Sequence, residues 1–358
     1  MRYSNGMKAL LIGGSGFIGP HVTRRLAEQG HQVAVFHRGL AKIALADGVR
    51  QILGDRKALA KSVPEFRRFA PDVVVDFILS SEGQAIELMN ATRGIAGRIV
   101  ALSSGDVYRA AGILHGLEPG PLQPVPLTEE SELRTHRHPY PPEALAMLRN
   151  VFAWLDDEYD KIPVEQVVMG DSEIRGTVLR LPMIYGPGDP LHRLHPILKR
   201  MDDGRPAILM QEELAQWRGL RGYVENVAAA IALAAISPQA AGRIYNVAEI
   251  ESFSELEWAQ NVGRVAGWKG TVLALPKQQT PAHLLIPYNA AQHWIASSAR
   301  IREELGYREP ISLDRALERT IAWERANPPA AFDPKQFDYA AEDAALATRA
   351  ASAHGKTA

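Results

Sequence analysis

The sequence predicts an α/β fold in which a doubly wound parallel sheet is joined to a second, smaller and mostly helical lobe. Over the first 110 residues, short apolar runs alternate with amphipathic stretches, a pattern that is typical of a parallel sheet covered by helices on both faces. Residues 190–220 leave this pattern, residues 221–247 return to it as a helix and a strand, and residues 252–327 are mainly helical. The second lobe is therefore expected to be interleaved with the first.

The expected strands are short and nearly continuous in apolar residues, as strands buried on both faces are. They cover residues 7–12, 32–36, 49–53, 72–77, 98–102 and 176–181. Helices are expected over residues 21–29, 83–92 and 142–158. Residues 112–142 are rich in proline and lack periodicity, so they are expected to form a long loop that covers a site or is loosely ordered.

These elements predict how the chain divides. Residues 1–185, to which residues 221–250 return, form a dinucleotide-binding domain. Residues 186–220 and 251–328 form a substrate-binding lobe, and residues 329–358 form a peripheral tail that is either a helix or disordered. The six tryptophans fall mainly in the second lobe and are expected to belong to its core.

Composition narrows the class of function. The 358 residues are 46% apolar and 23% charged with a net charge of -1, so no overall charge favours nucleic acid or an acidic membrane surface. The absence of cysteine excludes disulfides, thiolate metal ligands and cysteine nucleophiles. The longest apolar run, residues 227–236, is far shorter than the roughly 20 residues that span a bilayer. We therefore expect a cytoplasmic protein with no membrane partner.

A glycine-rich turn carries the strongest functional signal. Gly13, Gly16 and Gly19 form a GxxGxxG motif between the first expected strand and the first expected helix. Gly13 permits a tight turn, Gly16 lets the backbone approach a pyrophosphate, and Gly19 lets the helix pack closely. This context indicates a Rossmann-type dinucleotide site. Three further residues of the turn are expected to contact the cofactor: Ser15, Phe17 and Ile18.

The end of the second expected strand selects the dinucleotide. An NAD site places a carboxylate there for the ribose 2'-hydroxyl, but this chain has His37 followed by Arg38. The positive charge favours a 2'-phosphate and hence NADP, with NAD as the alternative if Arg38 stacks on adenine or faces solvent. Asp55, after the third expected strand, is placed either to accept from the adenine amino group or to cap the next helix.

Four further motifs follow the glycine turn in order. They are SSGDVY at residues 103–108, LRLPMIYGPGD at 179–189, YVENVA at 223–228 and YNV at 245–247. Together with GGSGFIG they resemble the extended short-chain dehydrogenase/reductase superfamily, which includes the NAD(P)-dependent epimerase/dehydratase family, over residues 7–325. The resemblance implies an NAD(P)-dependent enzyme that acts on a hydroxyl or carbonyl carbon of a sugar-like or nucleotide-linked small molecule. It also implies that Pro182 borders the cofactor.

The chemistry of this superfamily depends on a Ser or Thr and a YxxxK pair, in which the lysine lowers the pKa of the tyrosine that moves the substrate proton. The resemblance places Ser104 and Lys161 at the serine and lysine positions. Asp157 stands where the tyrosine belongs, and we expect it to be ionised, paired with Lys161 and structural. Tyr159 would face away from Lys161 in a regular helix, but Pro163 interrupts the helix and is expected to bring Tyr159 round.

Either Tyr159 or Asp106, which lies beside Ser104, is expected to do the acid-base work. Asp106 is alternatively a turn residue whose carboxylate binds a backbone amide. The atypical branch of the superfamily also lacks the YxxxK pair. The alternative function is therefore a catalytically degenerate NADP-binding protein with a regulatory or RNA-binding role, although the neutral net charge counts against nucleic acid as a partner. The sequence leaves a homodimer open.

Two other groups of side chains have two interpretations each. Arg218 and Arg221 are placed either to clamp a substrate phosphate or carboxylate, or to form ordinary surface ion pairs. The histidine pairs at residues 136/138 and 192/195 lack the accompanying carboxylates of a typical ligand set. No metal site is therefore expected.

Overall fold

The computed structural model describes residues 6–40 and 45–354. Its centre is a seven-stranded parallel sheet with the order β10-β6-β5-β4-β1-β2-β3. The strands are β1 (Lys8–Ile12), β2 (Gln32–His37), β3 (Arg50–Leu53), β4 (Val73–Asp76), β5 (Arg98–Ser104), β6 (Arg175–Leu181) and β10 (Arg243–Asn246). The strand order reverses beside β1, and the carboxyl ends of the strands at such a point form the ligand crevice of doubly wound sheets. The α/β prediction is confirmed.

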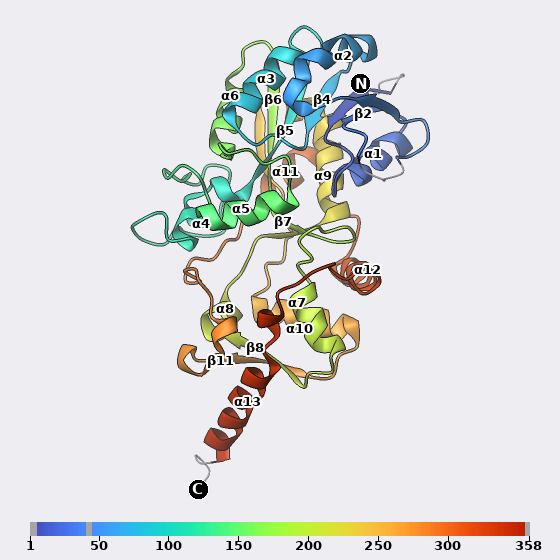
Figure 1. The fold of residues 1–358 in the computed structure, drawn as a ribbon. Helices are drawn as coiled ribbons and strands as arrows, with labels where there is room; N and C mark the ends of the chain where they lie inside the picture. Colours follow the sequence, from blue (N-terminus) through green and yellow to red (C-terminus); the bar gives the residue numbers. More distant parts are fainter. Residues whose placement is uncertain (1–5, 41–44, 355–358) are drawn as a thin grey trace.

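Helices cover both faces of the sheet (Figure 1). On one face, α1 (Gly19–Glu28) and α9 (Val224–Ile236) pack on each other and share one apolar core with the strands. On the other face, α2 (Val63–Phe69), α3 (Glu82–Thr92) and α6 (Lys161–Gly170) form a second core. Because successive side chains of a strand point to opposite faces, both faces require apolar residues, and this explains the continuous apolar runs.

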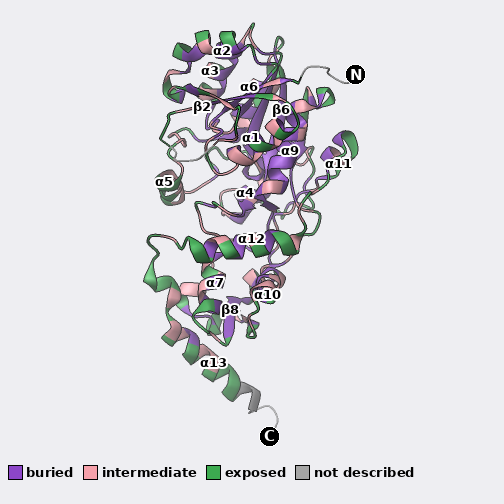
Figure 2. Ribbon diagram, turned by 90° about the vertical axis from the view of Figure 1, so that its right-hand side faces the viewer, coloured by how far each residue is buried: buried purple, intermediate pink, exposed green. Residues whose placement is uncertain are grey.

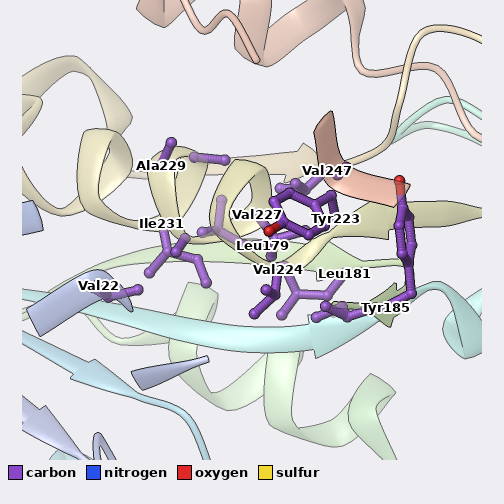
Figure 3. Close-up of a cluster of buried hydrophobic side chains, with 14 of the residues drawn as sticks. Val22, Leu179, Leu181, Tyr185, Tyr223, Val224, Val227, Ala229, Ile231 and Val247 are labelled. Atoms are coloured by element: carbon purple, nitrogen blue, oxygen red, sulfur yellow. The ribbon is translucent and has the colours of Figure 1, made fainter. Parts of the chain in front are cut away.

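The alanine-rich helix α9 is buried between the sheet and its neighbours. Ten of its thirteen residues are buried, and Figure 2 colours the helix mostly purple. Figure 3 shows Val224, Val227 and Ile231 of α9 close to Leu179 of β6, with Val22 of α1 beside them in the same cluster. No helix within residues 6–40 and 45–354 combines the length and the apolar character needed to cross a membrane.

The second lobe lies below the sheet in Figure 1. Two short parallel pairs of strands are involved: β7 (Met183–Tyr185) with β9 (Arg221–Tyr223), and β8 (Ala207–Gln211) with β11 (Thr271–Leu275). The later helices of this part are α7 (His195–Asp202), α8 (Glu212–Gln216), α10 (Glu255–Ala266), α12 (Leu313–Ala326) and α13 (Tyr339–His354). Helix α11 (Ala299–Leu305) instead packs against β10 and α9 beside the sheet (Figure 1). Residues 339–354 form the helix α13, one of the two alternatives expected for the tail, and it runs away from the lobe toward the C-terminus (Figures 1 and 2).

The segment between β5 and β6 contains a 3-10 turn, η2 (Gly105–Val107), and the helices α4 (Arg109–Leu114) and α5 (Pro142–Val151). The helix expected over residues 142–158 is therefore too long. The amide of Asp156 donates to Ser80 Oγ over 2.9 Å, and its carboxylate accepts from Ser81 Oγ over 2.6 Å. Asp160 then caps α6 by accepting from the amide of Ile162 over 3.0 Å. These polar contacts hold the chain outside a helix between α5 and α6.

Candidate active site

A cavity of about 510 Å³ lies at the carboxyl edge of the sheet, where the turn after β1, the end of β5 and the start of α6 meet. Ten residues singled out from the sequence line it: Gly13, Gly16, Phe17, Ile18, Gly19, Arg38, Ser104, Tyr159, Lys161 and Pro182. Four others are absent from its lining: Ser15, His37, Asp55 and Asp106. Motifs that are far apart in the sequence therefore converge on one site.

The glycine turn leaves room for a phosphate. Gly13 has a φ of 79°, in the left-handed region that favours glycine. A Cβ on Gly19 would lie 2.2 Å from the carbonyl oxygen of Gly14, whereas the nearest atom to a Cβ on Gly16 would be 3.8 Å away. Gly19 is thus required for close packing within the turn, while Gly16 borders open space. Open backbone beside the N-terminus of α1 fits the pyrophosphate of a dinucleotide.

Only one of the three residues predicted to contact the adenosine end lines the cavity. Arg38 is exposed and borders it. The ring of His37 is held by the protein, with Nε2 3.0 Å from Gln51 Oε1. Asp55 accepts from the amide of Lys57 over 2.9 Å and caps the turn that follows β3. Of the two roles expected for Asp55, the structure shows the capping role.

Lys161, the first residue of α6, is buried in the wall of the cavity. Its Nζ donates to the carbonyl oxygens of Leu79 and Leu102, the latter over 3.0 Å, and lies 5.3 Å from the centroid of the Trp154 ring. Burial lowers the pKa of Lys161 to about 8, although nearby carboxylates, first that of Asp106, oppose the shift. The amine is therefore still mainly protonated at neutral pH, beside the space that fits the cofactor.

Two tyrosines converge on the carboxylate of Asp106. The hydroxyls of Tyr159 and Tyr140 donate to Asp106 Oδ2 over 2.8 Å and 3.1 Å, respectively. Asp106 is fully buried, and its Oδ1 has no hydrogen-bond partner among residues 6–40 and 45–354. Burial and the charge of Asp106 raise the pKa of Tyr159 well above its ordinary value, so Tyr159 is a protonated donor at neutral pH. Ser104 Oγ accepts from the amide of Asp106 over 3.2 Å and borders the cavity.

The expected pairing of Asp157 with Lys161 is wrong. The Asp157 carboxylate is 89% exposed and pairs with Arg149 over 2.7 Å. Of the two effects expected of Pro163, a kink or a new start of the helix, the kink is wrong: α6 begins at Lys161 and Pro163 is its third residue, where a missing N–H removes no helical hydrogen bond. Tyr159 reaches the site because it precedes the helix.

Tyr140 is the residue of this site that the sequence analysis did not find. It lies in the proline-rich segment, 34 residues from Asp106, and no spacing rule joins the two. The segment thus reaches the site, which is one of the two roles expected for it. The turn role considered for Asp106 is not observed, because its carboxylate contacts the two hydroxyls instead of a backbone amide.

A second cavity, of about 400 Å³, adjoins the first, and Arg193 borders both. Arg221 lines the second cavity and pairs with Glu255, whereas Arg218 pairs with Glu257 over 3.0 Å. Both arginines considered for a substrate clamp are therefore in ion pairs. Three tryptophans expected in the core are buried as expected but also line this cavity, which the sequence did not predict: Trp217, Trp258 and Trp294.

Fold and site define an α/β protein with a cavity beside the glycine turn, where the backbone fits a dinucleotide pyrophosphate, and a second cavity next to it. The chain belongs to the NAD dependent epimerase/dehydratase family, whose sequence profile matches residues 9–248. The resemblance drawn from the motifs is therefore confirmed.

Two curated relatives are reductases. The chain is 26% identical to 2'-dehydrokanamycin reductase of Streptomyces kanamyceticus in an alignment of 268 residues, and the match covers 72% of this chain and 66%, just under two thirds, of that relative. It is 24% identical to 2-alkyl-3-oxoalkanoate reductase of Stenotrophomonas maltophilia (strain K279a) in an alignment of 350 residues, and the match covers 88% of this chain and 99% of that relative. Neither is described as a regulatory or RNA-binding protein.

The fold also matches solved structures. One is the dTDP-glucose 4,6-dehydratase of Bacillus anthracis str. Ames in complex with NAD, with a TM-score of 0.64 over 90% of this chain and 97% of that chain. At 14% identity, the similarity concerns the fold.

Proposed function

We propose that this protein is an NADP-preferring oxidoreductase that transfers a hydride and a proton between the cofactor and a hydroxyl or carbonyl carbon of a small molecule. One observation carries the proposal: Tyr159 donates to Asp106 over 2.8 Å, next to a cavity that Ser104 and Lys161 also line. The names of the two curated relatives, both reductases, support carbonyl reduction as the direction.

Tyr159 and Asp106 form a proton relay in this proposal. The bound nicotinamide supplies or accepts the hydride. When an alcohol is oxidised, its hydroxyl gives a proton to Tyr159 Oη while Tyr159 gives its own to Asp106 Oδ2. When a carbonyl is reduced, the steps run in reverse from the protonated form of Asp106: Tyr159 gives its proton to the substrate oxygen, which the Ser104 hydroxyl orients, and takes the proton of the Asp106 carboxylic acid, which is left as the carboxylate. Since the pKa of Tyr159 is raised by burial and by Asp106, Asp106 replaces the tyrosinate as the base.

Arg38 supports the preference for NADP over NAD. It lines the cavity directly after β2, where its charge suits a 2'-phosphate. Arg38→Ala is expected to weaken NADP binding by about 1.5–3 kcal/mol, the range for a hydrogen bond to a charged group, and to leave NAD binding unchanged. Arg67→Ala, at an exposed position of α2 outside the cavity, is the matched control in the calorimetric titration. Equal NADP and NAD affinities in the unaltered protein would contradict the preference.

The relay is tested by following the absorbance of NADPH with a panel of sugars and other carbonyl compounds. Tyr159→Phe and Asp106→Asn should each lower kcat by about 10²- to 10⁴-fold. Asp157→Asn is the matched control, because that carboxylate is 89% exposed and should not affect turnover. Full turnover in the first two variants with loss in the third would overturn the assignment. No conversion of any compound by a cofactor-loaded protein would favour the non-catalytic alternative.

A further inference from the structure

The second cavity presents rings with few polar atoms. Trp217 Nε1 donates to the carbonyl of Gln292 over 2.9 Å, and Trp294 Nε1 donates to the carbonyl of Gly105 over 3.1 Å. The hydroxyl of Tyr185 likewise donates to Glu249 Oε1 over 3.0 Å. Because the protein already satisfies these polar atoms, the three residues offer a ligand mainly the faces and edges of their rings.

The cations of this cavity wall are neutralised by carboxylates of the protein. Arg193 donates to Asp189 over 2.7 Å. Arg221 pairs with Glu255, and its guanidinium lies 4.7 Å from the centroid of the Trp258 ring. Among the described residues of the wall, the charge of each arginine is therefore already offset by a carboxylate of the protein, and Glu255 would repel a diphosphate.

The cavity adjoins the residues of the proton relay. His115 lines it and packs edge-on against Tyr140, with ring centroids 5.6 Å apart, and Tyr140 donates to Asp106. Burial lowers the pKa of His115, although Asp106 opposes the shift, so its imidazole is neutral at pH 7. Trp294 Nε1 donates to the carbonyl of Gly105, which directly follows the predicted catalytic Ser104. The body of a substrate whose reacting carbon meets the relay would therefore lie among these rings.

The role of this cavity rests on the proposed function. We propose that this cavity binds an uncharged and mainly apolar part of the substrate, attached to the reacting carbon, such as an alkyl chain or a ring system. It does not bind a nucleoside diphosphate. Apolar surface gains from leaving water for a wall of rings. A diphosphate would lose its hydration against cations that are already paired. The cavity then selects substrates by the apolar area and shape of this body.

A homologous series of straight-chain methyl ketones, with UDP-glucose and dTDP-glucose as the charged alternatives, tests the proposal. With NADPH, kcat/KM is expected to rise by about fourfold for each added methylene until the cavity is filled. The two nucleotide sugars should be neither converted nor inhibitory. A flat series together with conversion of, or competition by, a nucleotide sugar would overturn the apolar proposal and leave the hydride transfer intact.

Variants of the wall locate the effect. Trp258→Ala should lower kcat/KM for a long-chain ketone by about tenfold or more without changing the affinity for NADPH. Trp323→Phe is the matched control, since Trp323 stacks on His192 outside the lining of both cavities. If Trp258→Ala does not fold, Leu214→Lys at a half-buried position of the wall replaces it. Unchanged chain-length dependence in that variant would contradict the proposal.

Binding without turnover separates this proposal from the proposed function. In the NADP complex, a long-chain ketone should quench the fluorescence of the cavity tryptophans in a saturable way, and Trp258→Phe should reduce the quenching. Saturable quenching without oxidation of NADPH would refute the oxidoreductase function and support the apolar cavity. Absence of quenching would overturn the apolar cavity itself.

Discussion

Tyr159→Phe removes the hydroxyl of this residue and keeps its ring, so it tests the two parts of the side chain separately. The ring stacks on Tyr140 with centroids 6.1 Å apart, and the Nζ of Lys161 lies 5.7 Å from its centroid. Phenylalanine keeps the shape that makes these contacts. The substitution therefore removes one interaction, the hydrogen bond of 2.8 Å to Asp106 Oδ2.

The contacts of Asp106 determine the expected magnitude. Its Oδ1 already has no partner in the described part of the chain, so the variant leaves the carboxylate with the hydroxyl of Tyr140 at 3.1 Å. A hydrogen bond to a charged group contributes about 1.5–3 kcal/mol, and the free energy of unfolding should fall by that amount. Loss of the relay should lower kcat by about 10²- to 10⁴-fold, or about 3–5 kcal/mol of transition-state stabilisation. The loss of activity should therefore exceed the loss of stability.

Steady-state kinetics, thermal melting and cofactor titration of the same preparation test this prediction. Tyr140→Phe provides the comparison, because it removes the longer hydrogen bond to the same oxygen and should cost similar stability with a smaller effect on kcat. NADPH affinity should be unchanged in both variants. The reasoning is refuted if Tyr159→Phe melts at a lower temperature but turns over at the original rate, since its hydroxyl would then be structural.

Three other measurements address the lysine, the glycine turn and the loop. Because burial lowers the pKa of Lys161 to about 8, NADP affinity should fall as the pH rises through about 8; a step of equal size in Lys161→Met would assign it to another group. Since the unfolded chain binds more protons between pH 8 and the ordinary lysine pKa of 10.5, the contribution of this lysine to stability should rise with pH across that window. Gly19→Ala places a Cβ 2.2 Å from a carbonyl oxygen and should abolish cofactor binding. Cofactor binding by Gly19→Ala would contradict the role of the turn. The control variant Gly83→Ala, with open space around the new Cβ, should instead raise the free energy of unfolding by about 0.5–1 kcal/mol. Hydrogen exchange at residues 112–142 should slow only when substrate and cofactor are both bound, and unchanged rates in a demonstrated ternary complex would make this loop static.

The sheet was predictable because each strand is a separate apolar run, and a strand buried on both faces can be identified from its own residues alone. Helix α2 was not found, since its seven residues, Val63–Phe69, are too few to show a helical period and include Pro64. The glycine turn was found for the opposite reason: the backbone geometry that it needs is local and depends on residue type.

The residues of the candidate site were only partly predictable. Ser104 and Lys161 were located by motif, and both line the cavity. The position of Tyr159 depends on where α6 begins, which the cap from Asp160 determines. The rule that residues two apart lie on opposite faces of a helix therefore does not apply to Tyr159 and Lys161, because Tyr159 lies outside the helix. The contact between Tyr140 and Asp106 joins residues 34 apart, and such a pairing arises only when a long loop folds back.

The hydrogen bond from Trp294 to Gly105 joins residues 189 positions apart, and this separation bears on how the protein matures during synthesis. The sheet strands up to β6 and the glycine turn leave the ribosome well before Trp294 does. Val107 and Tyr108 also pack in one cluster with Ala248 and Trp294. The turn that carries Asp106 of the proposed relay therefore acquires its final support only when most of the chain has been made. A nascent chain is expected to gain the ability to hold a dinucleotide before it gains the ability to use one.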